Sequence, residues 1–151
     1  MTKVLFICRG NTCRSPMARA LAQKLGGGLV SATAAGLTPG LRETSPEAIK
    51  VLEEIKVPLP SRPARTAIPE QVAEADLVIA LGVELPPSLN AAATGKILSW
   101  DIPDPLGGGL AAYRKTRDLL RGCIADLLID LSDLPAERRD DAGEASGATR
   151  I

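Results

Sequence analysis

The chain has 151 residues, of which 45% are hydrophobic and 24% charged, and 18 Lys and Arg balance 18 Asp and Glu to give a formal net charge of zero. This profile is typical of one soluble globular domain, and the balanced charge gives no bulk attraction to nucleic acid or to a membrane surface. The chain has no histidine, which excludes serine–histidine and cysteine–histidine catalysis as well as histidine-ligated metal sites.

The first predicted elements are a buried strand and a helix joined by a short loop. Residues 4–7 (Val-Leu-Phe-Ile) are apolar and partly β-branched, as in the buried strands of a parallel sheet. Gly10 and Asn11 follow in a loop, and Pro16 fits the first turn of a helix over residues 17–25. A run of three glycines then ends that helix.

Strands and helices continue to alternate along the chain. Ser45 and Pro46 predict the N-cap and the first position of a second helix, and the prolines within residues 56–69 predict a surface loop. The remaining expected elements are strands at 29–32, 76–81 and 96–100, a Pro/Gly-rich loop at 101–109 and a last helix over about 110–131. This order predicts an α/β fold, a three-layer sandwich with a central four-stranded parallel sheet.

We expect one catalytic domain over residues 1–134 and a polar tail over residues 135–151, where apolar residues almost disappear. No apolar run approaches the roughly 20 residues that span a membrane. The three cysteines form no CxxC pair, and aromatic residues make up only 2% of the chain. The sequence therefore predicts a cytoplasmic protein with reduced thiols, no membrane partner and no nucleic-acid partner.

Residues 8–15 (Cys-Arg-Gly-Asn-Thr-Cys-Arg-Ser), here called the cysteine loop, carry the most informative pattern. A loop between a strand end and a helix start directs backbone N–H groups inward, and the helix dipole adds a positive end, so an oxyanion would bind there. Arg14 adds a fork of donors suited to phosphate oxygens, and the same field favours the thiolate of Cys8. A lone cysteine at a strand end is more often a buried core residue, but the neighbouring residue types favour a nucleophile.

Residues 4–18 resemble the phosphate loop of the low-molecular-weight protein-tyrosine phosphatase family. The resemblance covers residues 3 to about 131 and includes residues 76–79 (Asp-Leu-Val-Ile) and an Asp-Pro pair at 104–105. It implies a phosphotyrosine phosphatase I-like fold. It also implies these roles: Cys8 as nucleophile, Arg14 as phosphate clamp, Ser15 as thiolate stabiliser, Asn11 as loop brace and Asp104 as general acid.

The chemistry of phosphoryl transfer also calls for a proton donor, because the leaving group is poor and no histidine is present. Asp104 fits this role because a proline follows it, and Asp101 is the competing candidate. Cys8 would take the phosphoryl group as a cysteinyl-phosphate, and the Asp104 carboxylate would then activate water. No metal or cofactor is expected, because backbone amides and Arg14 would neutralise the phosphate oxygens.

The rest of the cysteine loop is expected to bind the substrate phosphate or another oxyanion, through Arg9, Gly10, Asn11, Thr12, Cys13 and Ser15. Cys13 either forms a reversible disulfide with Cys8, as the family resemblance implies, or packs behind the loop. Cys123 is expected in the core. Arg62 and Arg65 either form the rim of a site for an acidic substrate or lie on a solvated surface, which is the interpretation we favour.

The expected function is a phosphoprotein phosphatase that acts on phosphotyrosine, phosphoarginine or both. Leu106 and the glycines after it stand where tyrosine-specific members commonly carry aromatic residues, and Trp100 is the only indole near the loop. Thr12 is similar to the bacterial protein-arginine phosphatases, and its hydroxyl offers a polar contact to a guanidinium. These features favour phosphoarginine or a mixed specificity.

Two other functions remain open on the sequence. One is a thiol-dependent arsenate reductase of the same fold, but residues 78–89 contain no cysteine for an internal disulfide relay. The other is a pseudo-enzyme that binds phosphorylated proteins without turnover. The intact set of Cys8, Arg14 and Asp104 argues against that alternative.

Overall fold

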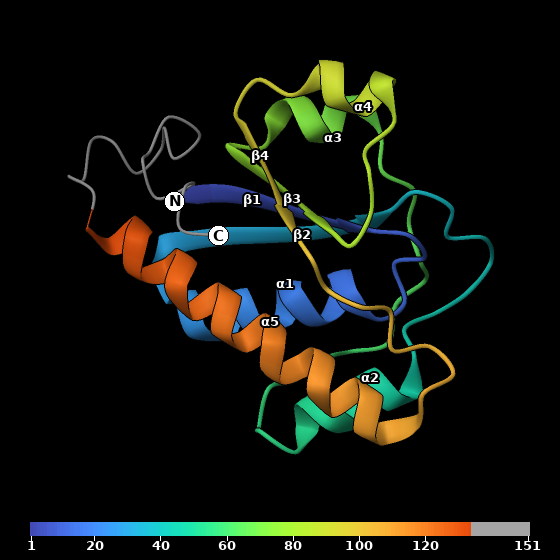
Figure 1. The fold of residues 1–151 in the computed structure, drawn as a ribbon. Coiled ribbons are helices and arrows are strands. Elements are labelled where there is room, and N and C mark those ends of the chain that lie inside the picture. Colours follow the sequence, from blue (N-terminus) through green and yellow to red (C-terminus); the bar gives the residue numbers. More distant parts are fainter. Residues whose placement is uncertain (134–151) are drawn as a thin grey trace.

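The computed structural model describes residues 1–133 (Figure 1), so the predicted tail at 135–151 and its boundary with the domain lie outside the described residues. Four parallel strands form one sheet in the order β2-β1-β3-β4. They span Thr2–Cys8 (β1), Val30–Gly36 (β2), Leu77–Leu81 (β3) and Lys96–Trp100 (β4). The predicted four-stranded parallel sheet is therefore confirmed.

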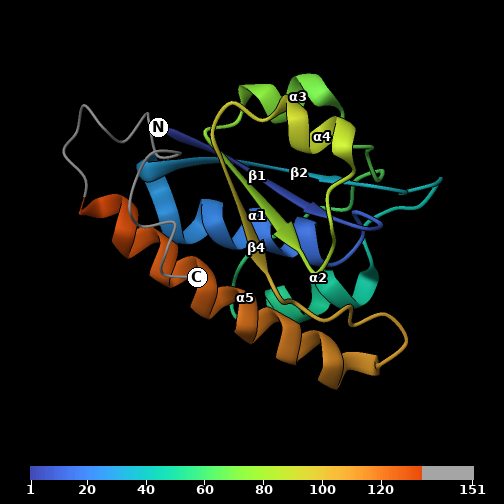
Figure 2. The same ribbon diagram turned by 45° about the horizontal axis from the view of Figure 1, so that its top comes forward.

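Helices cover both faces of this sheet (Figure 2). One face carries α1 (Arg14–Gly26), α2 (Pro46–Glu53) and α5 (Gly109–Ser132), and the other carries α3 (Pro69–Glu74) and α4 (Pro87–Ala92). A single 3-10 turn, η1 (Gly27–Leu29), links α1 to β2. The three layers match the predicted sandwich. Within residues 1–133, none of the helices combines the length and apolar character needed to cross a bilayer.

Alternate residues of β1 divide between two hydrophobic cores. Val4 and Phe6 pack toward α1 and α5, while Leu5 and Ile7 pack toward α3 and α4. All four side chains are at most 1% exposed. This is the pattern of a central parallel strand that is buried on both faces, and it fixes the strand end at Cys8 against the rest of the domain.

Three expectations from the sequence need correction. The second strand runs to Gly36 instead of ending at 32, because pairing with β1 holds an alanine-rich stretch whose own strand preference is weak. Sequence analysis did not predict α3 and α4, two short helices that each begin at a proline. Ser45 occupies the predicted N-cap position, but its hydroxyl makes no capping hydrogen bond. Instead Ser45 Oγ lies near Glu47 and Tyr113.

The sheet order places the end of β1 at a topological switch point. The chain passes from β1 to β2 on one side and returns to β3 on the other, so the connections leave β1 in opposite directions. In open α/β sheets, ligands bind in the crevice at the carboxyl ends of the strands where the order reverses. Cys8 is the last residue of β1, so the cysteine loop lies at that crevice.

Candidate active site

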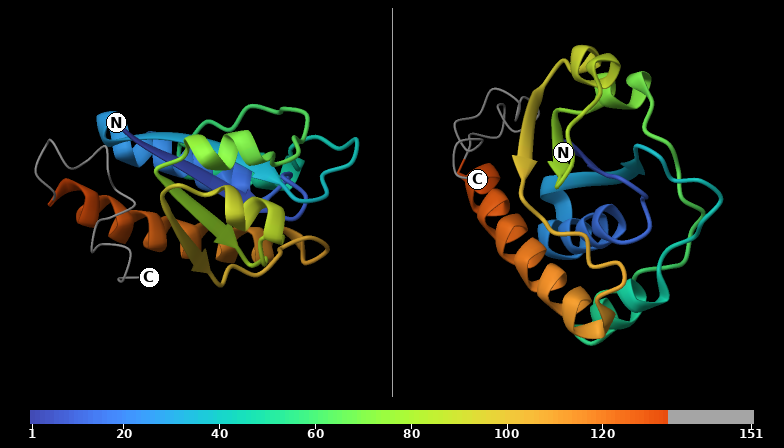
Figure 3. Two further views of the ribbon diagram at one scale, coloured as in Figure 1. Left: turned by 90° about the horizontal axis from the view of Figure 1, so that it is seen from above. Right: turned by 45° about the vertical axis from the view of Figure 1, so that its right-hand side comes forward.

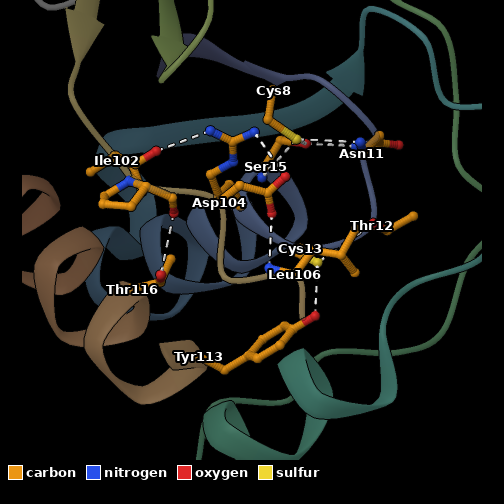
Figure 4. Close-up of polar contacts among 12 residues, drawn as sticks. Cys8, Asn11, Thr12, Cys13, Ser15, Ile102, Asp104, Leu106, Tyr113 and Thr116 are labelled. Carbon is orange, nitrogen blue, oxygen red and sulfur yellow. Dashed lines mark hydrogen bonds and ion pairs between the residues drawn. The ribbon is translucent and has the colours of Figure 1, made fainter. Parts of the chain in front are cut away.

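The Cys8 sulfur lies at the base of the cysteine loop and faces two backbone N–H donors and the Ser15 hydroxyl (Figure 4). The backbone N–H groups of Asn11 and Ser15 donate to Sγ at 3.3 and 3.4 Å. The Ser15 hydroxyl lies 3.0 Å from the same sulfur. Because the thiol is only 2% exposed, these donors act on it with little screening by water. Such an arrangement holds the sulfur in one position at the foot of the loop.

Asn11 holds the loop in this shape. Its backbone has a φ of 53°, a left-handed conformation that asparagine tolerates better than most residues. Its side-chain amide donates to Ser15 Oγ at 2.8 Å, and its Oδ1 accepts the backbone N–H of Arg65 at 2.9 Å. Asn11 thus connects the segment around Arg65 to the residue that contacts the sulfur, a geometry consistent with the predicted brace.

Arg14 is buried at the start of α1 and points across the end of the sheet. Its Nη1 donates to the carbonyl oxygen of Ile102 at 3.0 Å, and its Nη2 lies 3.6 Å from Asp104 Oδ2. Gly82 makes room for this side chain: it has a φ of +64°, and a Cβ there would collide with the Arg14 guanidinium and the Ile102 carbonyl. The guanidinium is therefore fixed in direction before any ligand binds.

The segment that carries Asp104 is tied to its neighbours at three points. Asp104 Oδ1 accepts the backbone N–H of Leu106 at 3.1 Å, Thr116 Oγ1 donates to the Pro103 carbonyl at 3.4 Å, and Ile102 accepts from Arg14. The Asp104 side chain remains 46% exposed, so water and a leaving group can reach it. Asp101, the competing candidate acid, is exposed and does not line the pocket.

These groups enclose a small pocket of about 120 Å³, here called the bowl. Its lining comes from the cysteine loop, one neighbouring loop and the Asp104 segment: Cys8, Arg9, Gly10, Thr12, Cys13, Arg14, Arg42, Asp104 and Leu106. The structure therefore brings all three predicted catalytic residues together. Asn11 and Ser15 support the bowl from behind and do not line it.

Arg42 is the bowl residue that sequence analysis missed. It lies in the loop between β2 and α2, and its guanidinium covers Gly10 so closely that a Cβ on that glycine would collide with it. Nothing in the local sequence marks Arg42, because the loop has no periodic pattern and its approach to Gly10 is a tertiary contact. Ile102 and Thr116 were missed for the same reason.

Cys13 and Tyr113 form a buried polar contact beside the bowl. Cys13 Sγ lies 3.4 Å from Tyr113 Oη and 3.5 Å from Thr12 Oγ1, and Ser45 Oγ lies 3.2 Å from the same tyrosine oxygen. Burial, together with the contact to Cys13, raises the pKa of Tyr113 to about 12. Tyr113 therefore stays a neutral hydroxyl at physiological pH. Cys123, which the sequence places in the core, is only half-buried in the structure.

The aromatic residues do not line the bowl. Trp100 is 2% exposed and packs against Phe6 with ring centroids 6.1 Å apart, so the indole near the loop belongs to the core. Tyr113 is 1% exposed. Because the chain has one Trp, one Tyr and one Phe, no aromatic ring is available at the mouth. Among residues 1–133, no three His, Cys, Asp or Glu side chains are grouped to hold a metal ion.

The fold and the site define a small α/β protein with a cysteine-centred oxyanion loop at the end of its first strand. The chain belongs to the low molecular weight phosphotyrosine protein phosphatase family, whose family model matches residues 3–139. The resemblance noted from residues 4–18, the fold class and the enzyme class are thereby confirmed.

Similarity to individual relatives extends over most of the chain. A glutaredoxin arsenate reductase from Synechocystis sp. is 32% identical over 136 residues, covering 87% of this chain and 100% of that protein. The protein-arginine-phosphatase of Bacillus subtilis is 31% identical over 143 residues, covering 82% of this chain and 93% of that protein. The solved structure of a low molecular weight protein tyrosine phosphatase from T. tengcongensis superposes with a TM-score of 0.72 at 31% identity, covering 85% and 99%. Nearly equal identities to three differently named relatives do not select one substrate.

Proposed function

We propose that this chain is a phosphoprotein phosphatase that hydrolyses phosphotyrosine, phosphoarginine or both through a cysteinyl-phosphate on Cys8. The observation that carries the proposal is the composition of the bowl, where a buried sulfur that faces two backbone N–H donors and the Ser15 hydroxyl shares one small pocket with Arg14 and Asp104. A nucleophile, an anion clamp and a proton donor are the three parts that this reaction requires. The proposed substrates are phosphorylated side chains of proteins. The proposed compartment is the reducing cytoplasm, where the free thiols of Cys8 and Cys13 would stay reduced.

In the first step, the Cys8 thiolate attacks phosphorus and forms an S–P bond while the P–O or P–N bond to the substrate breaks. Asp104 in its acid form donates its proton to the departing oxygen or nitrogen. Loop amides and the Arg14 guanidinium hold the three equatorial phosphate oxygens as charge develops on them. Arg14 serves this role without reorganisation because Ile102 already fixes its direction.

In the second step, the Asp104 carboxylate accepts a proton from a water molecule that attacks the same phosphorus. The S–P bond breaks, inorganic phosphate forms, and the Cys8 thiolate is regenerated with its donors still in place. Because the Asp104 side chain is partly exposed to solvent, the leaving group can depart and a water molecule can take its place beside the carboxylate. Both steps use only side chains and backbone amides of this chain and one water molecule.

The mouth of the bowl supports phosphoarginine or a mixed specificity. It presents the 61% exposed Leu106, and the described residues that line it include no ring to stack on a phenyl group. Thr12 is among the lining residues, and its hydroxyl would give a substrate guanidinium a polar contact that an aliphatic residue lacks. We therefore favour phosphoarginine over an exclusive preference for phosphotyrosine.

Arsenate reduction is the second candidate, favoured by one observation: Cys13 lines the same bowl as Cys8. A complete reduction would need a further thiol to release Cys8. No cysteine occurs in residues 82–95 after β3, and Cys123 on α5 does not line the bowl. An external small thiol would have to supply the electrons. The phosphatase reaction needs no such reductant, so we favour it.

A side-by-side turnover assay on phosphoarginine, phosphotyrosine and arsenate, with and without glutathione, tests the proposal. We expect phosphate release from both phosphorylated amino acids, independent of glutathione, and no arsenite. The Cys8→Ser variant is the control for contaminating activity. Arsenite formation that requires glutathione, with no phosphate release, would replace the phosphatase proposal by the reductase. Binding of both phosphorylated amino acids without turnover of any substrate would establish the pseudo-enzyme.

A further inference from the structure

A second hollow lies behind the cysteine loop. It has a volume of about 480 Å³ and is bounded by the outer edge of β2, the first half of α1 and the loop over residues 59–65. Its lining and that of the bowl have no residue in common, although Asn11 reaches this hollow and its neighbours in the loop reach the bowl. We call this hollow the arginine cleft, after Arg19, Arg62 and Arg65 in its wall.

The course of the chain explains why the cleft is open. β2 is an edge strand. Within residues 1–133 its outer side makes backbone hydrogen bonds only at Gly36, which donates to the Arg65 carbonyl and accepts from the Ala67 N–H, both at 2.8 Å. Just before this contact the chain leaves the strand edge, because Pro63 bridges to Glu43 in the neighbouring loop. Figure 3 shows the two loop segments running side by side away from the sheet. The arginine cleft lies along this stretch of β2 and is lined by residues 32–34 of the strand and by residues 59, 60, 62, 63 and 65 of the loop.

The charged groups in the cleft lining are of one sign. Among residues 1–133, three guanidinium groups line the cleft and no carboxylate does. Within residues 1–133, the side chains of Arg19, Arg62 and Arg65 form no hydrogen bond or ion pair. Two arginines on α5 differ in this respect, because Arg114 and Arg117 both pair with Glu54 at 2.7 Å.

Holding these cations together without a counter-charge is unfavourable. Arg19 is half-buried, and its burial together with the nearby charge of Arg62 lowers its pKa. An anion in the cleft would offset this repulsion. Its oxygens would also accept hydrogen bonds from the N–H groups of the planar guanidinium groups. The apolar walls from Leu59, Pro60 and Pro63 would accommodate the body of such a ligand.

We propose that the arginine cleft binds a small polyanion, a molecule that carries two or more phosphate or carboxylate groups, through Arg19, Arg62 and Arg65. The volume falls within the range of roughly 300–1,000 Å³ that small-molecule sites occupy. The ligand is a small molecule and not the substrate phosphate of the bowl, since the two pockets lie on opposite sides of Asn11. This inference does not depend on which substrate the bowl accepts.

The cleft is connected to the sulfur by a short chain of hydrogen bonds. The backbone N–H of Arg65 donates to Asn11 Oδ1 at 2.9 Å, Asn11 donates to Ser15 Oγ at 2.8 Å, and Ser15 Oγ lies 3.0 Å from Cys8 Sγ. A ligand held by Arg65 therefore stabilises the segment that braces the cysteine loop. Binding only to the folded chain also raises its melting temperature by mass action.

Isothermal titration calorimetry with two probes, pyrophosphate and citrate, tests the proposal at physiological ionic strength. The first variant, Arg19→Gln with Arg62→Gln, removes two charges from the cleft, and the second, Arg9→Gln with Arg42→Gln, removes two charges from the mouth of the bowl. We expect the first variant to weaken binding of at least one probe by about tenfold or more and the second to change it by less than about twofold. Measuring both probes distinguishes phosphate from carboxylate as the preferred group.

Three results would overturn the proposal: no binding of either probe, equal losses in the two variants, or full affinity in the cleft variant. Equal losses would mean attraction by net charge alone. Because Arg19 is half-buried, the single variant Arg62→Gln, at an exposed position, serves as the check on folding. If that variant binds as tightly as the wild type, the cleft is not the site. Amide shifts of Arg65 and Ala34 on addition of a probe, without shifts of Gly10 and Thr12, are the expected spectroscopic signature.

Discussion

The bowl and the arginine cleft lie on either side of Asn11, and both present arginine to an anion, but they are built differently. In the bowl, Arg14 is buried and held by Ile102 and Asp104 within a pocket of about 120 Å³. In the cleft, Arg62 and Arg65 are exposed around a space of about 480 Å³. The first is preorganised around one tetrahedral group, and the second can adapt to ligands of several shapes.

This difference predicts where substitutions act. Removing a fixed group from the bowl should abolish or strongly slow chemistry, because nothing else can take its place in a pocket of that size. Removing an unpaired arginine from the cleft should leave chemistry intact and change only ligand binding. The following predictions test that separation, beginning with the largest effect.

Cys8→Ser should abolish turnover of a generic aryl phosphate, because a serine hydroxyl is a far weaker nucleophile than a cysteine thiolate at this position, where two backbone N–H groups face the sulfur. Steady-state phosphate release measures the effect. Arg62→Gln is the matched variant from the cleft and should retain the wild-type rate. Residual activity of more than a few per cent in Cys8→Ser would remove Cys8 from the role of nucleophile.

Asp104→Asn should lower kcat by roughly 10²–10⁴-fold for phosphorylated substrates with poor leaving groups. The loss should be smaller for aryl phosphates with good leaving groups, because these need less protonation in the first step. Asp101→Asn is the matched control, since Asp101 is exposed and does not line the bowl. A leaving-group-dependent loss in Asp101→Asn, with normal rates in Asp104→Asn, would reverse the assignment of the acid.

Thr12→Ile should shift the ratio of kcat/KM values toward phosphotyrosine and away from phosphoarginine. The substitution replaces a hydroxyl in the bowl lining by an aliphatic group, and the site then loses its polar contact to a guanidinium. Competition assays with both substrates in one reaction measure the ratio directly. An unchanged ratio would leave the preference for phosphoarginine without support.

Glu54→Gln should lower the melting temperature by a few degrees at most, because Glu54 is partly exposed and its pairs with Arg114 and Arg117 are screened by water. The hydrogen bond from Arg114 is the main cause that lowers the pKa of Glu54 from 4.5 to about 2. The folded pKa lies below the unfolded one, so the contribution is complete above pH 4.5 and is lost as the pH falls toward 2.

Thermal melts of the wild type and Glu54→Gln across this range check the sign. The difference between the two proteins should shrink as the pH decreases from neutrality to 2.5. A difference that grows at low pH would contradict the assignment. Arg62→Gln offers the comparison with an unpaired arginine, and it should melt at or slightly above the wild-type temperature.

The sequence predicted those parts of the molecule that are encoded locally. The cysteine loop lies between a strand and a helix that follow directly in the chain, so residue types at 8–15 were sufficient to indicate its geometry. β1 and β3 are short apolar runs, so the sequence alone indicated them as buried strands. Asp104 was found because an Asp-Pro pair before the last helix matches the family, although its distance to Arg14 could not be derived from spacing.

The remaining parts depend on contacts between distant segments. Arg42 reaches the bowl only because the loop after β2 folds over Gly10, and Thr116 supports the Asp104 segment from another element. Arg62 and Arg65 were expected on a solvated surface, and both are exposed. Their convergence with Arg19 could not be anticipated, because it requires the bridge between Pro63 and Glu43 that pulls the chain off the edge of β2.

The most direct test of the central claim is to trap the covalent intermediate. The Asp104→Asn variant, mixed with an aryl phosphate and quenched in acid within one turnover, should contain a fraction of chains heavier by one phosphoryl group. Peptide mass spectrometry should locate that group on Cys8, and the Cys8→Ser variant treated in the same way should lack a thiophosphate. A phosphoryl group on any other residue, or turnover with no labelled Cys8 at any time point, would contradict the account.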